Sequence, residues 1–114
     1  MKRVFVELPS FRKAWADMGL GDSDLRRLQS QLLEDPKIGS VIRGGGGVRK
    51  MRFAFEDRGK SGSVRVIYID FEVYEKIYLL AAYQKNVKEN LSMQERNDLG
   101  RIVSILEDEI KNKQ

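Results

Sequence analysis

Residues 48–71 read VRKMRFAFEDRGKSGSVRVIYIDF, and this stretch decides the fold. Its first eight residues alternate with period two, so Lys50 and Arg52 share one face of a strand. The apolar positions fall on the other face: Met51, Phe53 and Phe55. The last nine residues are almost continuously apolar, which is typical of a central strand covered on both faces. A polar turn separates the two runs and predicts an antiparallel pair.

The residues before this pair predict one strand and two helices. Residues 3–8 alternate as a short strand, and Ser10 is the expected N-cap of the first helix. Apolar residues recur there at helical spacing: Phe11, Ala14, Trp15 and Met18. A second helix starts at residues 21–23, carries an apolar stripe of leucines and ends before Pro36. We expect the two helices to form a hairpin on one face of the sheet, followed by a loop over residues 37–47.

The residues after the pair predict a third strand and a final helix. Residues 77–85 follow a polar turn and read IYLLAAYQK, which places Leu79, Ala81, Tyr83 and Lys85 on one strand face. Ser92 and Glu95 form a capping box at the start of the helix. The helix has a single apolar stripe, which favours packing on the sheet over projection toward a partner: Leu99, Ile102, Val103, Leu106 and Ile110.

The element order is β-α-α-β-β-β-α, which predicts an α+β fold with a small, mainly antiparallel sheet. The three consecutive strands form a meander, and the first strand is expected at an edge or beside a central strand. A chain of 114 residues fits one domain, residues 1–114.

Composition excludes several kinds of site. There is no cysteine and no histidine, which removes thiolate chemistry, the commonest metal ligands and the commonest general acid and base. No spacing of carboxylates typical of a calcium loop is present, so no metal is expected. The amino terminus does not read as a signal peptide and no apolar run is long enough to span a membrane. A soluble, cytoplasmic protein is expected.

The positive charge is concentrated in one segment. The chain carries +4, and residues 43–65 alone hold seven Lys and Arg residues against Glu56 and Asp57, a segment charge of +5. Such clustering is typical of a surface that binds an anionic partner, although a solvated surface with scattered cations is the alternative.

The glycines in this segment do not form a nucleotide-binding motif. Residues 59–61 read GKS, but the first glycine of a P-loop would fall at Ala54, inside a strand. Residues 44–47 are all glycine, yet a strand follows them where a dinucleotide fingerprint requires a helix. Two interpretations stay open: a flexible lead-in to the strand, or a backbone that approaches a ligand closely.

The cations of neighbouring strands could converge on one sheet surface with a tyrosine: Lys50, Arg52, Arg65, Tyr83 and Lys85. Guanidinium groups grip phosphates and tyrosine can stack on a base, so this set suits single-stranded RNA. Cleavage would need a base for the 2′-hydroxyl, neutralisation of the phosphate and an acid for the leaving oxygen, supplied without histidine. The residues alone favour RNA binding over cleavage and leave both open.

Several motifs taken together resemble one family. The runs GGVRKMR at 46–52 and RGKSGSVRVIY at 58–68, and the pattern LLxxYxKN at 79–86, are similar to RelE-type toxins of bacterial toxin–antitoxin pairs, within the RelE/ParE superfamily and closest to its HigB-like branch. Upstream residues match as well, from DLxxLQ at 24–29 to DPxxGxVI at 35–42.

The resemblance implies a RelE-like fold and an mRNA interferase, a metal-independent endoribonuclease that cleaves mRNA on the ribosome and inhibits translation. It implies no cofactor, and as partners it implies mRNA, ribosomal RNA and a cognate antitoxin of helix-turn-helix type, with operator DNA bound only through the antitoxin complex. The implied catalytic residues are Lys50, Arg65, Tyr83 and Lys85. The implied RNA-binding residues are Arg49, Arg52, Arg58 and Lys60. The alternative is a non-catalytic module that binds RNA, the ribosome or the antitoxin as a co-repressor.

Overall fold

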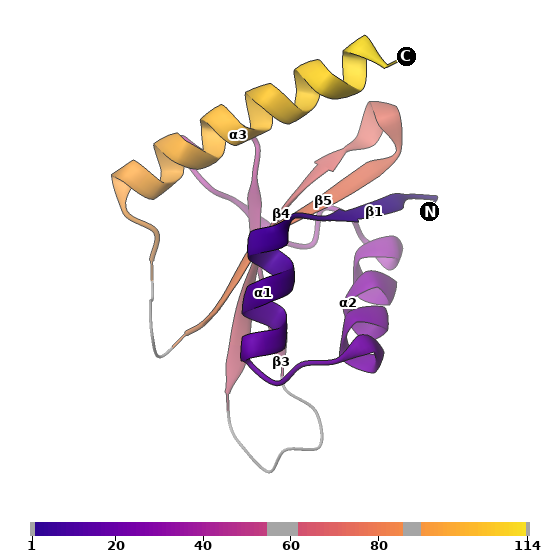
Figure 1. The fold of residues 1–114 in the computed structure, drawn as a ribbon, viewed down its shortest axis with the longest axis vertical. Helices are drawn as coiled ribbons and strands as arrows, with labels where there is room; N and C mark the ends of the chain where they lie inside the picture. Colours follow the sequence, from indigo (N-terminus) through magenta and orange to yellow (C-terminus); the bar gives the residue numbers. More distant parts are fainter. Residues whose placement is uncertain (1, 55–61, 86–89, 114) are drawn as a thin grey trace.

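A five-stranded sheet forms the centre of the molecule (Figure 1). The computed structural model describes residues 2–54, 62–85 and 90–113. The strands are β1 (Val4–Glu7), β2 (Ser40–Val41), β3 (Arg49–Ala54), β4 (Ser63–Phe71) and β5 (Lys76–Gln84), and a 3-10 turn (Glu72–Tyr74) joins β4 to β5. The helices are α1 (Pro9–Asp17), α2 (Asp22–Glu34) and α3 (Met93–Asn112).

The strand order is β1-β5-β4-β3-β2. Strands β2 to β5 are antiparallel, and β1 lies parallel to β5 at the edge of the sheet. The α+β class, the mainly antiparallel sheet and the edge position of the first strand are therefore confirmed. The two-residue strand β2 was not expected, because the sequence predicted only a loop over residues 37–47.

The two faces of the sheet have separate hydrophobic cores. The α1–α2 hairpin covers one face, where Phe11, Trp15, Leu28, Leu32, Met51, Phe53, Val64, Val66, Tyr68 and Leu79 are buried together. Helix α3 covers part of the other face, where it packs on Val48, Ile67, Ile69, Phe71, Tyr78 and Leu80. Figure 1 shows α3 crossing the top of the molecule, away from the α1–α2 hairpin. The helical hairpin on one face and the packing of the last helix on the sheet are both confirmed.

The sequence predicted an N-cap for α1 and a capping box for α3, and only the second prediction is confirmed. The capping box of α3 is confirmed, because the Ser92 hydroxyl accepts from the Glu95 N–H at 3.1 Å and the Glu95 carboxylate accepts from the Ser92 N–H at 2.9 Å. The expected N-cap of α1 is wrong: Leu8 is the N-cap and Pro9 occupies the first helical turn. The Ser10 hydroxyl instead donates to the Leu80 carbonyl at 2.9 Å and joins α1 to β5.

Strand β5 contains a bulge. Ala81 pairs with Ile67 and Leu79 pairs with Tyr68, so Leu80 has no partner position on β4. Leu80 and Ala81 both belong to the core under α3, whereas Leu79 lies in the core under α1 and α2. The expectation that Leu79 shares a face with Ala81 and Tyr83 is therefore wrong, because the bulge interrupts the period of two.

The glycine turn before β3 packs against α3. Gly44, Gly46 and Gly47 have positive φ angles of 79°, 74° and 103°, which side chains rarely allow. A Cβ atom on Gly46 would lie 3.2 Å from the Cα atom of Gly100, in the middle of α3. The close approach made by these glycines is therefore to a helix of the same chain.

Two alanine substitutions at this contact are expected to change stability in opposite directions. Gly100→Ala should raise the free energy of unfolding by about 0.5–1 kcal/mol, because alanine favours the helix and its Cβ would meet the nearest atom, the Gly44 carbonyl oxygen, at an ordinary 3.7 Å. Gly46→Ala should lower it by roughly 1–2 kcal/mol, because its φ angle of 74° is strained for alanine. Urea unfolding measures both; a loss in Gly100→Ala would contradict the described spacing.

Candidate nucleic-acid interface

Five of the predicted site residues lie on the side of the sheet that α3 covers in part. Arg65 in β4 pairs with Arg52 in β3 on one side and with Tyr83 in β5 on the other. The three residues therefore form a row across the three strands. Directly opposed residues have Cβ atoms about 4.5–5.5 Å apart, so one phosphate or nucleotide can contact neighbouring members of the row.

Two further cations extend this row. Lys50 pairs with Ile67 two residues along the ladder, on the same face as Arg52. Lys85 follows directly on β5, and its N–H donates to the Ser63 carbonyl at 3.3 Å, so its backbone lies beside the start of β4. Arg52 and Lys85 are exposed, and Lys50, Arg65 and Tyr83 are partly exposed. We call these five residues, Lys50, Arg52, Arg65, Tyr83 and Lys85, the basic face.

The basic face is electrostatically unfavourable by itself. Arg52 and Arg65 are like charges in directly opposed positions, an arrangement that destabilises a sheet. Across residues 2–54, 62–85 and 90–113, no carboxylate lies within ion-pair distance of its four cations. An anionic ligand would relieve this repulsion, and guanidinium groups are suited to grip phosphate oxygens in pairs.

Arg49 does not join the basic face. It pairs with Tyr68 and lies on the face covered by α1 and α2. Its Nη1 atom donates to the Gly39 carbonyl at 2.7 Å and to the Lys37 carbonyl at 3.2 Å. The period of two that placed Met51 under the helices also places Arg49 there, so the sequence did contain this signal.

The other two predicted RNA-binding residues lie outside the described residues. Arg58 and Lys60 belong to the stretch between β3 and β4, residues 55–61, and their role stays a prediction.

Tyr68 makes polar contacts from within the apolar run of β4. It is fully buried, and its hydroxyl accepts from the Gly39 N–H and donates to the Pro36 carbonyl, each at 2.9 Å. Burial raises the pKa of this phenol, with a smaller lowering contribution from the Gly39 hydrogen bond, so the hydroxyl keeps its proton. A tyrosine inside an otherwise apolar strand signals such a contact, because a buried hydroxyl needs a partner.

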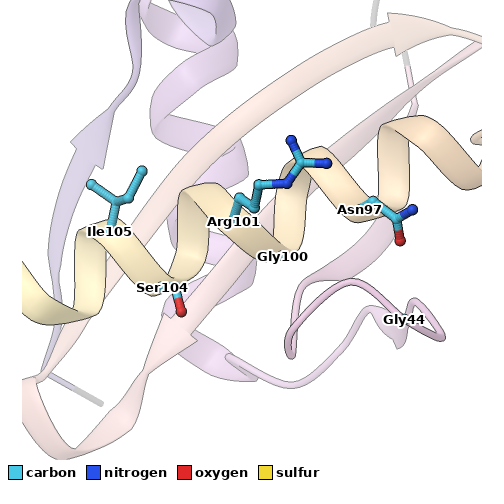
Figure 2. A pocket seen from close by; sticks show the side chains of 6 residues that line it. All are labelled: Gly44, Asn97, Gly100, Arg101, Ser104 and Ile105. Carbon is cyan, nitrogen blue, oxygen red and sulfur yellow. The ribbon is translucent and has the colours of Figure 1, made fainter.

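A groove outside the basic face lies where α3 meets the glycine turn. It is lined by Gly44, Asn97, Gly100, Arg101, Ser104 and Ile105. Figure 2 shows Asn97 and Ser104 pointing toward the side of the glycine turn and Arg101 and Ile105 pointing the other way. Arg101 also lies 3.3 Å from Asp98, whereas the cations of the basic face have no such carboxylate partner among the described residues.

Comparison with known proteins agrees with the fold and the residue pattern. A family model described as the RelE toxin of the RelE/RelB toxin–antitoxin system matches residues 2–113. The chain belongs to the RelE toxin family. The resemblance seen in the sequence is thereby confirmed for this family, whereas the HigB-like branch stays a prediction.

A solved structure shows the same fold as this RelE-family toxin. It is the structure of an E. coli toxin RelE mutant, with two arginines replaced by alanine, in the free state. The TM-score is 0.54 at 17% sequence identity, over 78% of this chain and 90% of that chain. In the residues described for this RelE-family toxin, no helix is long and apolar enough to cross a membrane.

The repulsion on the basic face leads to a test on stability. Arg52→Gln should raise the free energy of unfolding by about 0.2–1 kcal/mol, because it removes one of two opposed like charges. The same change should weaken binding of a single-stranded RNA oligonucleotide. Thermal unfolding and fluorescence anisotropy measure the two effects.

A matched control separates this effect from net charge. Arg12→Gln makes the same change of charge at an exposed position on α1, so stability and RNA affinity should change little. Equal effects of the two substitutions on RNA binding would show that the basic face has no special part in it.

Proposed function

We propose that this RelE-family toxin is a ribosome-dependent mRNA endonuclease that inhibits translation and is neutralised by a cognate antitoxin, as in the HigB-like branch. The observation that carries the proposal is the row of Arg52, Arg65 and Tyr83 on the α3 side of the sheet, extended by Lys50 and Lys85. Four cations beside one tyrosine, with no carboxylate paired to them among the described residues, match an RNA strand in both charge and stacking.

The reaction is attack of the 2′-oxygen of one nucleotide on its own 3′-phosphate. The bond from the 2′-oxygen to phosphorus forms and the bond from phosphorus to the 5′-oxygen breaks, which leaves a cyclic phosphate and a 5′-hydroxyl. In the proposal Arg65 and Lys50 clamp the scissile phosphate and stabilise its developing charge. Arg52 and Lys85 assist them, and Tyr83 stacks on or activates the nucleotide.

Dependence on the ribosome is supported by the shape of the site. The basic face belongs to one side of a sheet, so in this proposal RNA lies against that side only. In-line attack needs the RNA backbone held in a bent geometry, and orientation of this kind supplies a large part of a rate enhancement. The decoding site would hold the mRNA from the other side.

The alternative function is a non-catalytic module that binds RNA or the ribosome, or an antitoxin-bound co-repressor. One observation favours it: among the described residues, the basic face contains cations and a tyrosine but no carboxylate that could act as a general base. In either case an antitoxin, proposed to be of helix-turn-helix type, would be the protein partner and the route to operator DNA.

Mapping of mRNA ends tests the proposal. Induction of the wild-type chain should produce new mRNA ends within translated codons. Arg65→Ala and Lys50→Ala should each lower single-turnover cleavage on programmed ribosomes by about 100-fold or more, because each removes charge stabilisation at the scissile phosphate. Arg12→Ala, on α1, should cleave like the wild type.

Two results would count against this assignment. Full cleavage by both Arg65→Ala and Lys50→Ala would show that the basic face is not the site. No new ends from the wild type, with co-sedimentation on ribosomes retained, would support the binding module.

A further inference from the structure

The segment between α2 and β2 is held by two side chains on the far side of the sheet from the basic face. Tyr68 binds the Pro36 carbonyl and the Gly39 N–H, and Arg49 binds the Lys37 and Gly39 carbonyls. We call these two side chains, Arg49 and Tyr68, the edge clamp. They are direct cross-strand neighbours on β3 and β4, so together they form one rigid support.

The segment that the edge clamp holds lies against the backbone of Lys50, a residue of the basic face. Gly39 leads into β2, where Ser40 pairs with Lys50. Gly39 approaches so closely that a Cβ atom on it would lie 2.9 Å from the Lys50 carbonyl oxygen. The position of β2 against Lys50 therefore depends on how Gly39 is held.

Strand β2 cannot hold this position by itself. It has two residues, and strands that short have little pairing of their own. Gly39 and Pro36 are buried, so their polar backbone groups would be left without partners if the clamp were removed. With the clamp absent, β3 becomes a free edge at Lys50, and the direction of the Lys50 side chain is no longer fixed.

We propose that Arg49 and Tyr68 are positioning residues that act on bound RNA through Lys50, and that Arg49 is not an RNA ligand. The proposal rests on the function proposed above. In this proposal, Arg49 and Tyr68 on the far face of the sheet help to place Lys50 against the scissile phosphate. Small displacements of a group that holds a reacting phosphate in place can cost up to 100-fold in rate.

The test compares Tyr68→Phe with Lys50→Ala. Tyr68→Phe leaves every cation in place, so RNA affinity and its salt dependence should stay at wild-type values, while single-turnover cleavage on ribosomes should fall roughly tenfold or more. Lys50→Ala should lower the rate and reduce the slope of log affinity against log salt by about one. Tyr78→Phe removes the hydroxyl of a buried tyrosine under α3 and should change none of these quantities.

A double-mutant cycle separates positioning from general stability. In the Lys50→Ala background, Tyr68→Phe should cause no further loss of rate, because the residue it positions is absent. Additive losses would overturn the proposal and show that Tyr68 only stabilises the fold. Arg49→Gln should keep the wild-type salt slope; a slope reduced by about one would show that Arg49 does bind RNA.

Hydrogen exchange keeps this test separate from the proposed function. Amide hydrogens of residues 49–51 should exchange faster in Tyr68→Phe than in Tyr78→Phe, whether or not the wild type cleaves mRNA. Absence of cleavage by the wild type would defeat the proposed function. Unchanged exchange in Tyr68→Phe would defeat the edge clamp.

Discussion

The rest of the structure depends on the register of β4. This strand is bonded to β3 and β5 along its two edges and packed under helices on both faces, and only Arg65 and Asp70 among its nine residues are not buried. A slip of one residue would turn Val64, Val66 and Tyr68 away from their core, so apolar burial fixes the register firmly. The same register places Arg65 between Arg52 and Tyr83. The free energy of folding thus holds together charges that repel each other.

The two charged residues of β4, Arg65 and Asp70, differ in whether a partner of opposite charge lies beside them among the described residues. Asp70 is partly exposed as a residue, but its side chain is only 2% exposed. Its carboxylate accepts from Arg3 at 2.7 Å and lies 3.6 Å from Lys37, so this charge ties β1 and the segment after α2 to the sheet. Arg65, near the other end, has no such partner among the described residues. The charge at one end of the strand is therefore paired within the chain, whereas the charge near the other end has no carboxylate partner among the described residues.

Most of the fold could be predicted from periodicity, because the deciding residues are close in sequence. The alternation around Met51 predicted both faces of β3, and the apolar run predicted both end residues of β4 correctly. Ser92 with Glu95 predicted the start of α3. The features that were missed depend on distant residues. The segment that leads into β2 is held by Arg49 and Tyr68, the glycine turn packs against Gly100, and the bulge at Leu80 exists only relative to β4. Patterns within one segment do not contain such information.

The bulge gives β5 one residue more than its ladder with β4 requires. Because Ala81 pairs with Ile67 and Leu79 with Tyr68, a chain that lacked any one of residues 80–82 could pair without interruption and still place Tyr83 opposite Arg65. A chain with one additional residue there would need a second irregularity or would turn Tyr83 into the opposite core. The pairing of β5 with β4 can therefore accommodate the loss of one residue in β5 but not the gain of one. We therefore expect the fold to tolerate a one-residue deletion within residues 80–82 better than a one-residue insertion there.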